Sequence, residues 1–256
     1  MLQIYEILDR VELLYPNNDF YKDLRKTVSS DDKFALFRIL QNDNSSALLE
    51  GLRKYKDDPF FNVDCFSRGQ IKSKQWLLTE LEKLNVDLGT IFLCAGWYAT
   101  LATMLFESEC KIDKIRSFDI DKSCVEIAET FNKKYVSKDW KFKALQHDIH
   151  DITYKDFSWT FWSVKNNRMS YPITDSANTI INTSCEHIDN FRLWYDYLPS
   201  DALLVLQTNN YFEIEDHINC SESLEHFTEV TPLSNVLYEG ELHLGKYTRY
   251  MRIGYR

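Results

Sequence analysis

The sequence predicts an α/β protein in which a mainly parallel sheet alternates with helices. Short apolar runs recur between segments of helical spacing, at 90–93, 115–118, 141–145, 178–182 and 202–207. The first run leads through a tight turn of small residues at 94–96 into a helical segment, and the second ends on an acid, Asp119. Two further segments, 236–244 and 247–255, instead alternate apolar and polar residues around Gly245-Lys246, which indicates an antiparallel hairpin.

Each remaining element follows from its spacing. Apolar residues predict helices at 76–84, 122–135, 189–197 and 221–227, and strands at 236–244 and 247–255. Residues 1–60 have helical spacing interrupted by turn clusters such as Pro16-Asn17-Asn18. We therefore expect a helical cap over residues 1–70 and a sheet domain over residues 71–256.

Composition and charge exclude several classes of protein. The net charge of −9 argues against a protein that grips phosphate backbones, so nucleic acid is an unlikely partner. The six cysteines form no cluster of zinc-site spacing, so we expect no metal site and reduced thiols in the cytoplasm. The first ten residues contain acids and do not form a signal peptide, and no apolar run approaches the ~18 residues of a membrane span. A small-molecule or peptide substrate fits these properties best.

The order strand, tight turn, helix, strand and acid is typical of a sheet that binds a nucleoside. The turn lets backbone N–H groups approach the ligand, and the carboxylate accepts hydrogen bonds from ribose hydroxyls. Asp119 is the acid in this position. It could instead cap the helix that begins near Lys122, although Asp121 is better placed to do so.

Over residues 70–256 this arrangement resembles the class I S-adenosylmethionine (SAM)-dependent methyltransferases. The resemblance implies a Rossmann-like seven-stranded sheet that ends in an antiparallel strand, with SAM as cofactor. It places the first motif at 94–97, the ribose acid at 119, the adenine segment at 148–149 and the fourth strand end at 182–183. The cofactor-binding residues that it implies are Cys94, Ala95, Gly96, Trp97, Asp119, Ile120, Asp148, Ile149, Asn182 and Thr183. The sequence departs from the family in keeping a single glycine in the first motif, followed by the bulky Trp97 and Tyr98.

Cys185-Glu186-His187 follows the predicted strand 178–182 and has the most reactive side chains in the sequence. Ligands bind at the carboxyl ends of strands in open α/β sheets. His187 or Glu186 could accept a proton from the substrate, or Glu186 could anchor a cationic group of the substrate. Alternatively, both residues merely open the next helix, with Asp189 as its cap.

Two further segments are candidates for substrate contact. Arg68 and Lys74, assisted by Ser67 and Gln70, could clamp a carboxylate, and a solvated basic linker is the alternative. Asn209 and Tyr211 belong to a polar run, 207–212, that ends the fifth strand; the run suits a polar substrate, and an ordinary polar turn is the alternative.

Two other features have open interpretations. His217 could face the pocket or be an ordinary loop residue. The aromatic connection 157–172 could form a substrate lid, with Trp162 and Tyr171 as a cation–π wall, or an extra packed hairpin.

The function predicted from these residues is methyl transfer from SAM to a small molecule or a peptide side chain. The departures around Gly96 keep two alternatives open. One is an enzyme of the same fold that cleaves SAM or transfers its aminobutyrate arm, and the other is a non-catalytic module that binds a nucleoside.

Overall fold

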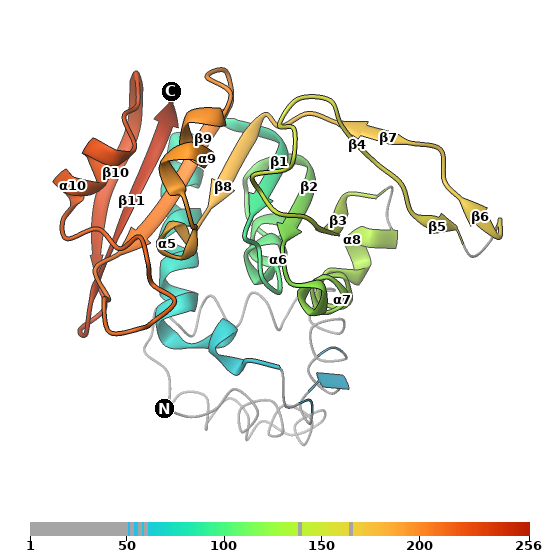
Figure 1. The fold of residues 1–256 in the computed structure, drawn as a ribbon, viewed down its shortest axis with the longest axis horizontal. Helices are drawn as coiled ribbons and strands as arrows, with labels where there is room; N and C mark the ends of the chain where they lie inside the picture. The colour runs from blue at the N-terminus through green and yellow to red at the C-terminus, as the bar shows by residue number, and fades with distance from the viewer. Residues whose placement is uncertain (1–50, 52–53, 56–57, 59–60, 138–139, 164–165) are drawn as a thin grey trace.

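The computed structural model describes residues 51–256, except for 52–53, 56–57, 59–60, 138–139 and 164–165 (Figure 1). The helical cap expected over residues 1–70 lies mostly outside the described residues and stays a prediction. The described chain includes a 3₁₀ turn, η1 (Val63–Phe66), and helix α5 (Arg68–Leu84). Helix α5 begins where the Ser67 hydroxyl accepts a hydrogen bond from the Gln70 N–H, so the predicted boundary at residue 70 falls inside its first turn.

A seven-stranded sheet forms the centre of the molecule and confirms the predicted architecture. Its strands follow the order β10-β11-β9-β8-β1-β2-β3, and the chain switches direction across the sheet between β1 and β8. All pairs from β9 to β3 are parallel, whereas β11 runs antiparallel to both neighbours. The strands are β1 (Asp87–Cys94), β2 (Lys111–Asp119), β3 (Phe142–Gln146), β8 (Thr179–Asn182), β9 (Leu203–Asn209), β10 (Asn235–His243) and β11 (Thr248–Tyr255).

Helices cover both faces of this sheet. One face packs against α5, α6 (Thr100–Phe106) and α7 (Lys122–Phe131), with Leu81, Leu101 and Ile127 in its core. The other packs against α9 (Phe191–Tyr197) and α10 (Leu224–Val230), with Trp194 and Phe227 fully buried. Among the described helices, none is both long and apolar enough to cross a bilayer. Because the parallel strands are covered on both sides, their carboxyl ends are left as the open edge where ligands bind.

The predicted helix 122–135 is divided into α7 and α8 (Lys133–Ser137) at Asn132. The Asn132 side chain is completely buried, and its amide donates hydrogen bonds to the carbonyls of Ala99 and Ala128. Its amide oxygen accepts a hydrogen bond from the Thr103 hydroxyl at 3.0 Å. The break therefore fastens α7 to the start of α6.

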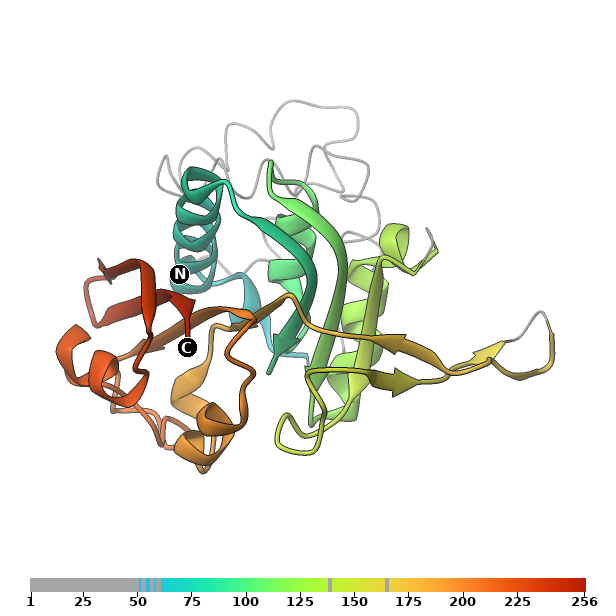
Figure 2. The same cartoon turned by 90° about the horizontal axis from the view of Figure 1, so that it is seen from above.

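The connection 157–172 belongs to an antiparallel arm that projects from the body (Figures 1 and 2). The arm consists of β4 (Phe157–Trp159) paired with β7 (Ile173–Asp175), and β5 (Trp162–Ser163) paired with β6 (Arg168–Met169). Its base is held by Asp175, which accepts hydrogen bonds from Arg116 Nε at 2.6 Å and from Trp159 Nε1 at 2.9 Å. Trp162 and Tyr171 are exposed on the arm and do not line the described cavity, and the Tyr171 ring instead lies 5.3 Å from the Arg168 guanidinium.

Candidate functional site

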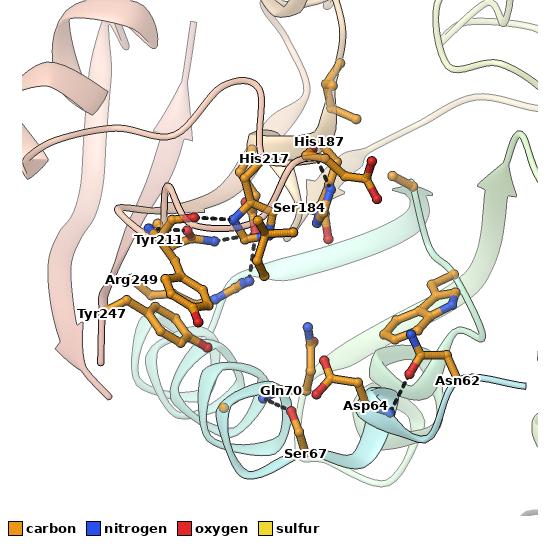
Figure 3. Close-up of a pocket in the computed structure, with 18 of the residues that line it drawn as sticks. Asn62, Asp64, Ser67, Gln70, Ser184, His187, Tyr211, His217, Tyr247 and Arg249 are labelled. Atoms are coloured by element: carbon orange, nitrogen blue, oxygen red, sulfur yellow. Dashed lines mark hydrogen bonds and ion pairs between the residues drawn. The ribbon is translucent and has the colours of Figure 1, made fainter. Parts of the chain in front are cut away.

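A cavity of about 1280 Å³ opens at the carboxyl edge of the sheet. The ends of β1, β2 and β3 border one side of it, and η2 (Cys185–His187), the end of β9 and the β10–β11 turn border the other. The start of α5, with Ser67 and Gln70, lies across the opening from His187 and His217 (Figure 3). The predicted site residues that line the cavity are Ala95, Trp97, Asp119, Ile120, Asp148, Ile149, Glu186, His187, Asn209 and Tyr211.

Five predicted site residues do not line this cavity: Cys94, Gly96, Lys74, Asn182 and Thr183. Cys94 is buried below it, with its sulfur 3.7 Å from the Tyr154 hydroxyl. Asn182 uses its side-chain oxygen to accept a hydrogen bond from the Ser184 N–H, and Thr183 uses its carbonyl to accept one from Arg249. These two residues support the loop and do not face the opening.

Lys74, one of the two residues of the predicted basic clamp, does not line the cavity. The Lys74 ammonium is buried and donates to the Gln70 side-chain oxygen at 2.6 Å, and burial lowers its pKa to about 8. The side chain of Arg68 lies outside the described residues. Gln70 lines the cavity at this end of the site.

The turn after β1 has a backbone that glycine-poor sequences rarely adopt. Ala95, Trp97 and Ala99 all have φ near +50°, in the left-handed region, whereas Gly96 does not. Gly96 is needed for space, because a Cβ on it would lie 2.1 Å from the Ser117 Oγ on β2. The turn after β1 therefore contains three non-glycine residues in the left-handed conformation, and each of them has a steric cost.

Replacing one of these left-handed residues with glycine is expected to cost the protein little stability. We expect Ala95→Gly to leave the free energy of unfolding unchanged or to raise it by up to ~1 kcal/mol, because lost strain offsets the entropy of the unfolded chain. The control, Ala102→Gly inside α6, should lower it by ~1 kcal/mol or more. Urea unfolding of both variants measures the difference, and equal losses would contradict a strained turn.

Asp119 is fixed at the centre of the cofactor side. Its carboxylate accepts hydrogen bonds from the Trp97 N–H at 2.8 Å and from the Asp121 N–H at 3.0 Å. Burial raises the pKa of this carboxyl. Asp121, not Asp119, caps α7 by accepting from the Ser123 N–H. Asp119 therefore holds the turn against β2 while it lines the cavity.

Asp148 follows β3 at the same edge. Its carboxylate accepts hydrogen bonds from the backbone N–H and the ring Nδ1 of His150, and these lower its pKa. Asp151, a second acid three residues further along the chain, does not line the cavity. Ile120 is largely exposed beside Asp119, and Ile149 is buried in the cavity wall. An acid and two apolar side chains thus frame the outer part of this side.

Trp97 and Tyr98 do not close the cavity together. Tyr98 is buried and stacks on Phe61 at 5.1 Å, and its hydroxyl accepts a hydrogen bond from the Asn62 N–H. Trp97 is half-buried, stacks on Tyr98 and lines the opening. Only one of the two bulky side chains therefore reaches the ligand space.

Glu186 is a buried carboxylate with one satisfied oxygen. Its Oε1 accepts hydrogen bonds from Arg249 Nη2 at 2.8 Å and from Asn209 Nδ2 at 2.6 Å. Its Oε2 is buried with no hydrogen-bond partner among the described residues. Arg249 is also buried and donates through Nη1 to the carbonyl of Thr183. Glu186 is thus a fixed anion with an acceptor oxygen still available.

Two imidazoles lie beside this carboxylate. The His187 and His217 ring centroids are 4.6 Å apart, and the rings are nearly perpendicular. His187 Nδ1 lies 3.1 Å from the Asp216 carbonyl, and His217 Nδ1 lies 2.7 Å from the Tyr211 carbonyl. Burial lowers the pKa of His217. The predicted alternative, in which Asp189 caps the next helix, does not hold, because Asn190 occupies the N-cap of α9 without a side-chain cap.

Sequence reasoning missed the contribution of the C-terminal hairpin. Arg249 comes from β11, and Tyr247 stacks on Tyr211 at 5.2 Å. The available signal was an arginine at a polar position of the alternating pattern 247–255, because an arginine that becomes buried needs an anionic partner. The hairpin thus supplies the cation that neutralises Glu186.

The cavity is acidic on balance. Among the described residues that line it, six are carboxylates and three are lysine or arginine: Asp64, Asp119, Asp148, Glu186, Asp189 and Asp216 against Lys72, Lys246 and Arg249. Such a lining favours cationic or neutral ligands over polyanions.

Comparisons with solved structures show the fold. The magnesium protoporphyrin IX methyltransferase of Synechocystis PCC 6803, solved with bound SAM, is 12% identical, with 90% of this chain and 99% of that chain covered at a TM-score of 0.52. The N-methyltransferase NodS of Bradyrhizobium japonicum WM9, in complex with S-adenosyl-l-homocysteine (SAH), is 11% identical over 88% and 99% of the chains at 0.51. The small RNA methyltransferase HEN1 is 12% identical over 72% and 25% at 0.51. No family model and no curated protein matches the sequence. The chain therefore has the Rossmann-like fold of class I methyltransferases.

Proposed function

We propose that this chain is a SAM-dependent methyltransferase that acts on a small molecule or a peptide side chain. One observation carries the proposal: the turn at 95–97, Asp119 and the segment 148–149 share a single cavity with Glu186 and His187. The first three features suit a nucleoside, and the last two suit an acceptor that must lose a proton. The methyltransferase order of the strands supports this division.

The residues on the cofactor side fit SAM. Asp119 offers carboxylate oxygens to ribose hydroxyls, and Ile120 and Ile149 offer apolar contact to an adenine ring, with Asp148 at its edge. The acidic lining suits the sulfonium and ammonium groups of this cofactor. When bound, SAM would supply an electrophilic methyl group, and the chain's own contribution is to orient both partners and exclude water.

The acceptor side contains a candidate proton acceptor and an anchor. His187 is exposed to the cavity through a ring that is oriented by the Asp216 carbonyl. Glu186 is already paired with Arg249, so it suits anchoring of a donor group on the substrate better than proton removal. The net charge of −9 and the acidic cavity favour a small or peptidic acceptor over a nucleic acid.

Calorimetric titration of the purified chain with SAM and with SAH tests the proposal. We expect micromolar binding of both. No binding of either ligand to the folded protein would refute the cofactor assignment. Analysis of the nucleoside product then separates the reactions, because methyl transfer yields SAH, whereas transfer of the aminobutyrate arm yields methylthioadenosine.

Replacing His187 tests the acceptor side separately. We expect His187→Ala to lower turnover by ~10²-fold or more while SAM affinity changes less than ~2-fold, because this ring lies on the opposite side of the cavity from Asp119. His226→Ala, on α10 outside the cavity, is the matched control and should retain turnover. An equal loss of turnover in both variants would remove His187 from its proposed role.

A further inference from the structure

The cluster Glu186, His187 and His217 has the composition of a transition-metal site, and its ligand atoms lie within 4.8 Å of one another. Each of the three residues offers one ligand atom. Two imidazoles and one carboxylate form a ligand set that binds first-row divalent metals and leaves positions open. Ligands about 2.1 Å from a tetrahedral ion lie roughly 3.4 Å apart, so the side chains need to close by at most about 1.4 Å.

The hydrogen bonds of both rings prepare this site. A backbone carbonyl can only accept, so the bonds to the carbonyls of Asp216 and Tyr211 put the proton of each ring on Nδ1. Each Nε2 then has a free lone pair, and neither Nε2 makes a hydrogen bond within the described part of the chain. Fixing the tautomer of a histidine through its other nitrogen is the usual support of a metal ligand.

The carboxylate is prepared in the same way. Glu186 Oε1 is held by Arg249 and Asn209, whereas the buried Oε2 has no partner among the described residues. A buried carboxylate oxygen without a partner costs free energy, and a metal ion would satisfy it. The Arg249 guanidinium contacts the other oxygen, Oε1, and leaves Oε2 available to a ligand.

We propose that Glu186, His187 and His217 bind a first-row divalent transition metal at the acceptor side of the cavity. Its open positions face the space where the acceptor binds. The role that follows rests on the proposed function: the ion coordinates an acceptor hydroxyl and lowers its pKa, and the proton passes to solvent water. His187 then acts as a metal ligand and no longer as the proton acceptor, which makes the acceptor class a hydroxyl compound.

The test uses the full chain, freed of metal with a chelator and then dialysed. We expect one equivalent of Co²⁺ to bind, with visible absorption bands of a low-coordinate site, and Zn²⁺ to displace it. His187→Gln and His217→Gln should each weaken binding by ~10-fold or more. The control His226→Gln, outside the cavity, should bind Co²⁺ as the wild type does. Thermal unfolding of the metal-free proteins checks that all variants are folded.

Two results would overturn the proposal: no stoichiometric Co²⁺ or Zn²⁺ binding by the folded wild type, or an equal loss of binding in His226→Gln. SAM titration of the metal-free chain is scored separately, so failure of the metal site and failure of the cofactor assignment are distinguishable. With both ligands bound, chelation should abolish methyl transfer to hydroxyl acceptors while SAM affinity is retained. Full turnover in the metal-free chain would refute the catalytic role of the ion.

Discussion

Replacing Asp119 with alanine is expected to weaken SAM binding by about 10²–10⁴-fold. Hydrogen bonds to a charged group contribute about 1.5–3 kcal/mol each, and a carboxylate can accept one from each ribose hydroxyl. Asp119 also accepts from the Trp97 N–H, so its loss loosens the turn that lines the cavity. Calorimetry of the variant gives the affinity directly.

Asp121→Ala is the matched control for this change. Asp121 stands two residues away and caps α7, but it does not line the cavity. It should cost ~1 kcal/mol of stability and leave SAM affinity unchanged. Because burial raises the pKa of Asp119, wild-type affinity should decline with falling pH earlier than an exposed aspartate would allow. An Asp119→Ala variant that binds SAM like the wild type would end the ribose assignment.

Replacing Arg249 with methionine should destabilise the protein by ~3–5 kcal/mol. The change leaves Glu186 buried and without its cation, and such uncompensated charges are the costliest result of breaking a buried pair. Urea unfolding of the variant and of the wild type measures this loss of stability.

Two further variants make this result specific. Arg192→Met removes an exposed i,i+4 pair with Asp196 and should cost no more than ~0.5 kcal/mol. Adding Glu186→Gln to Arg249→Met should recover part of the loss, because it removes the unpaired charge. If the double variant were as unstable as the sum of its single changes, the pair would not be energetically coupled.

The strand pattern made the sheet predictable, because buried parallel strands are continuous apolar runs and the last hairpin alternates. The break at Asn132 was not predictable from local spacing. It depends on the Ala99 carbonyl, 33 residues earlier, which only the packing of α6 against α7 brings near. Helical periodicity continues through this residue and carries no sign of its tertiary partner.

The site was predictable where it is local and not where it is long-range. Asp119 was found because strand, turn and acid are neighbours in sequence, and its partner Trp97 is 22 residues away. The single glycine of the first motif did not indicate where the backbone is left-handed. The residues with positive φ are Ala95, Trp97 and Ala99, and Gly96 is not one of them. Arg249 was missed because its relation to Glu186 exists only after β11 inserts beside β9.

The two halves of the cavity differ in sequence separation: the contacts that form them close loops of different length. The Trp97–Asp119 contact closes a short loop, whereas the Glu186–Arg249 contact spans 63 residues and the Gln207–Ser73 contact spans 134. Closing longer loops costs more entropy, and non-local contacts form more slowly. We therefore expect the nucleoside half to consolidate first during folding and the acceptor half last. A chain that stalls before β11 docks would hold a nucleoside without being able to act on an acceptor.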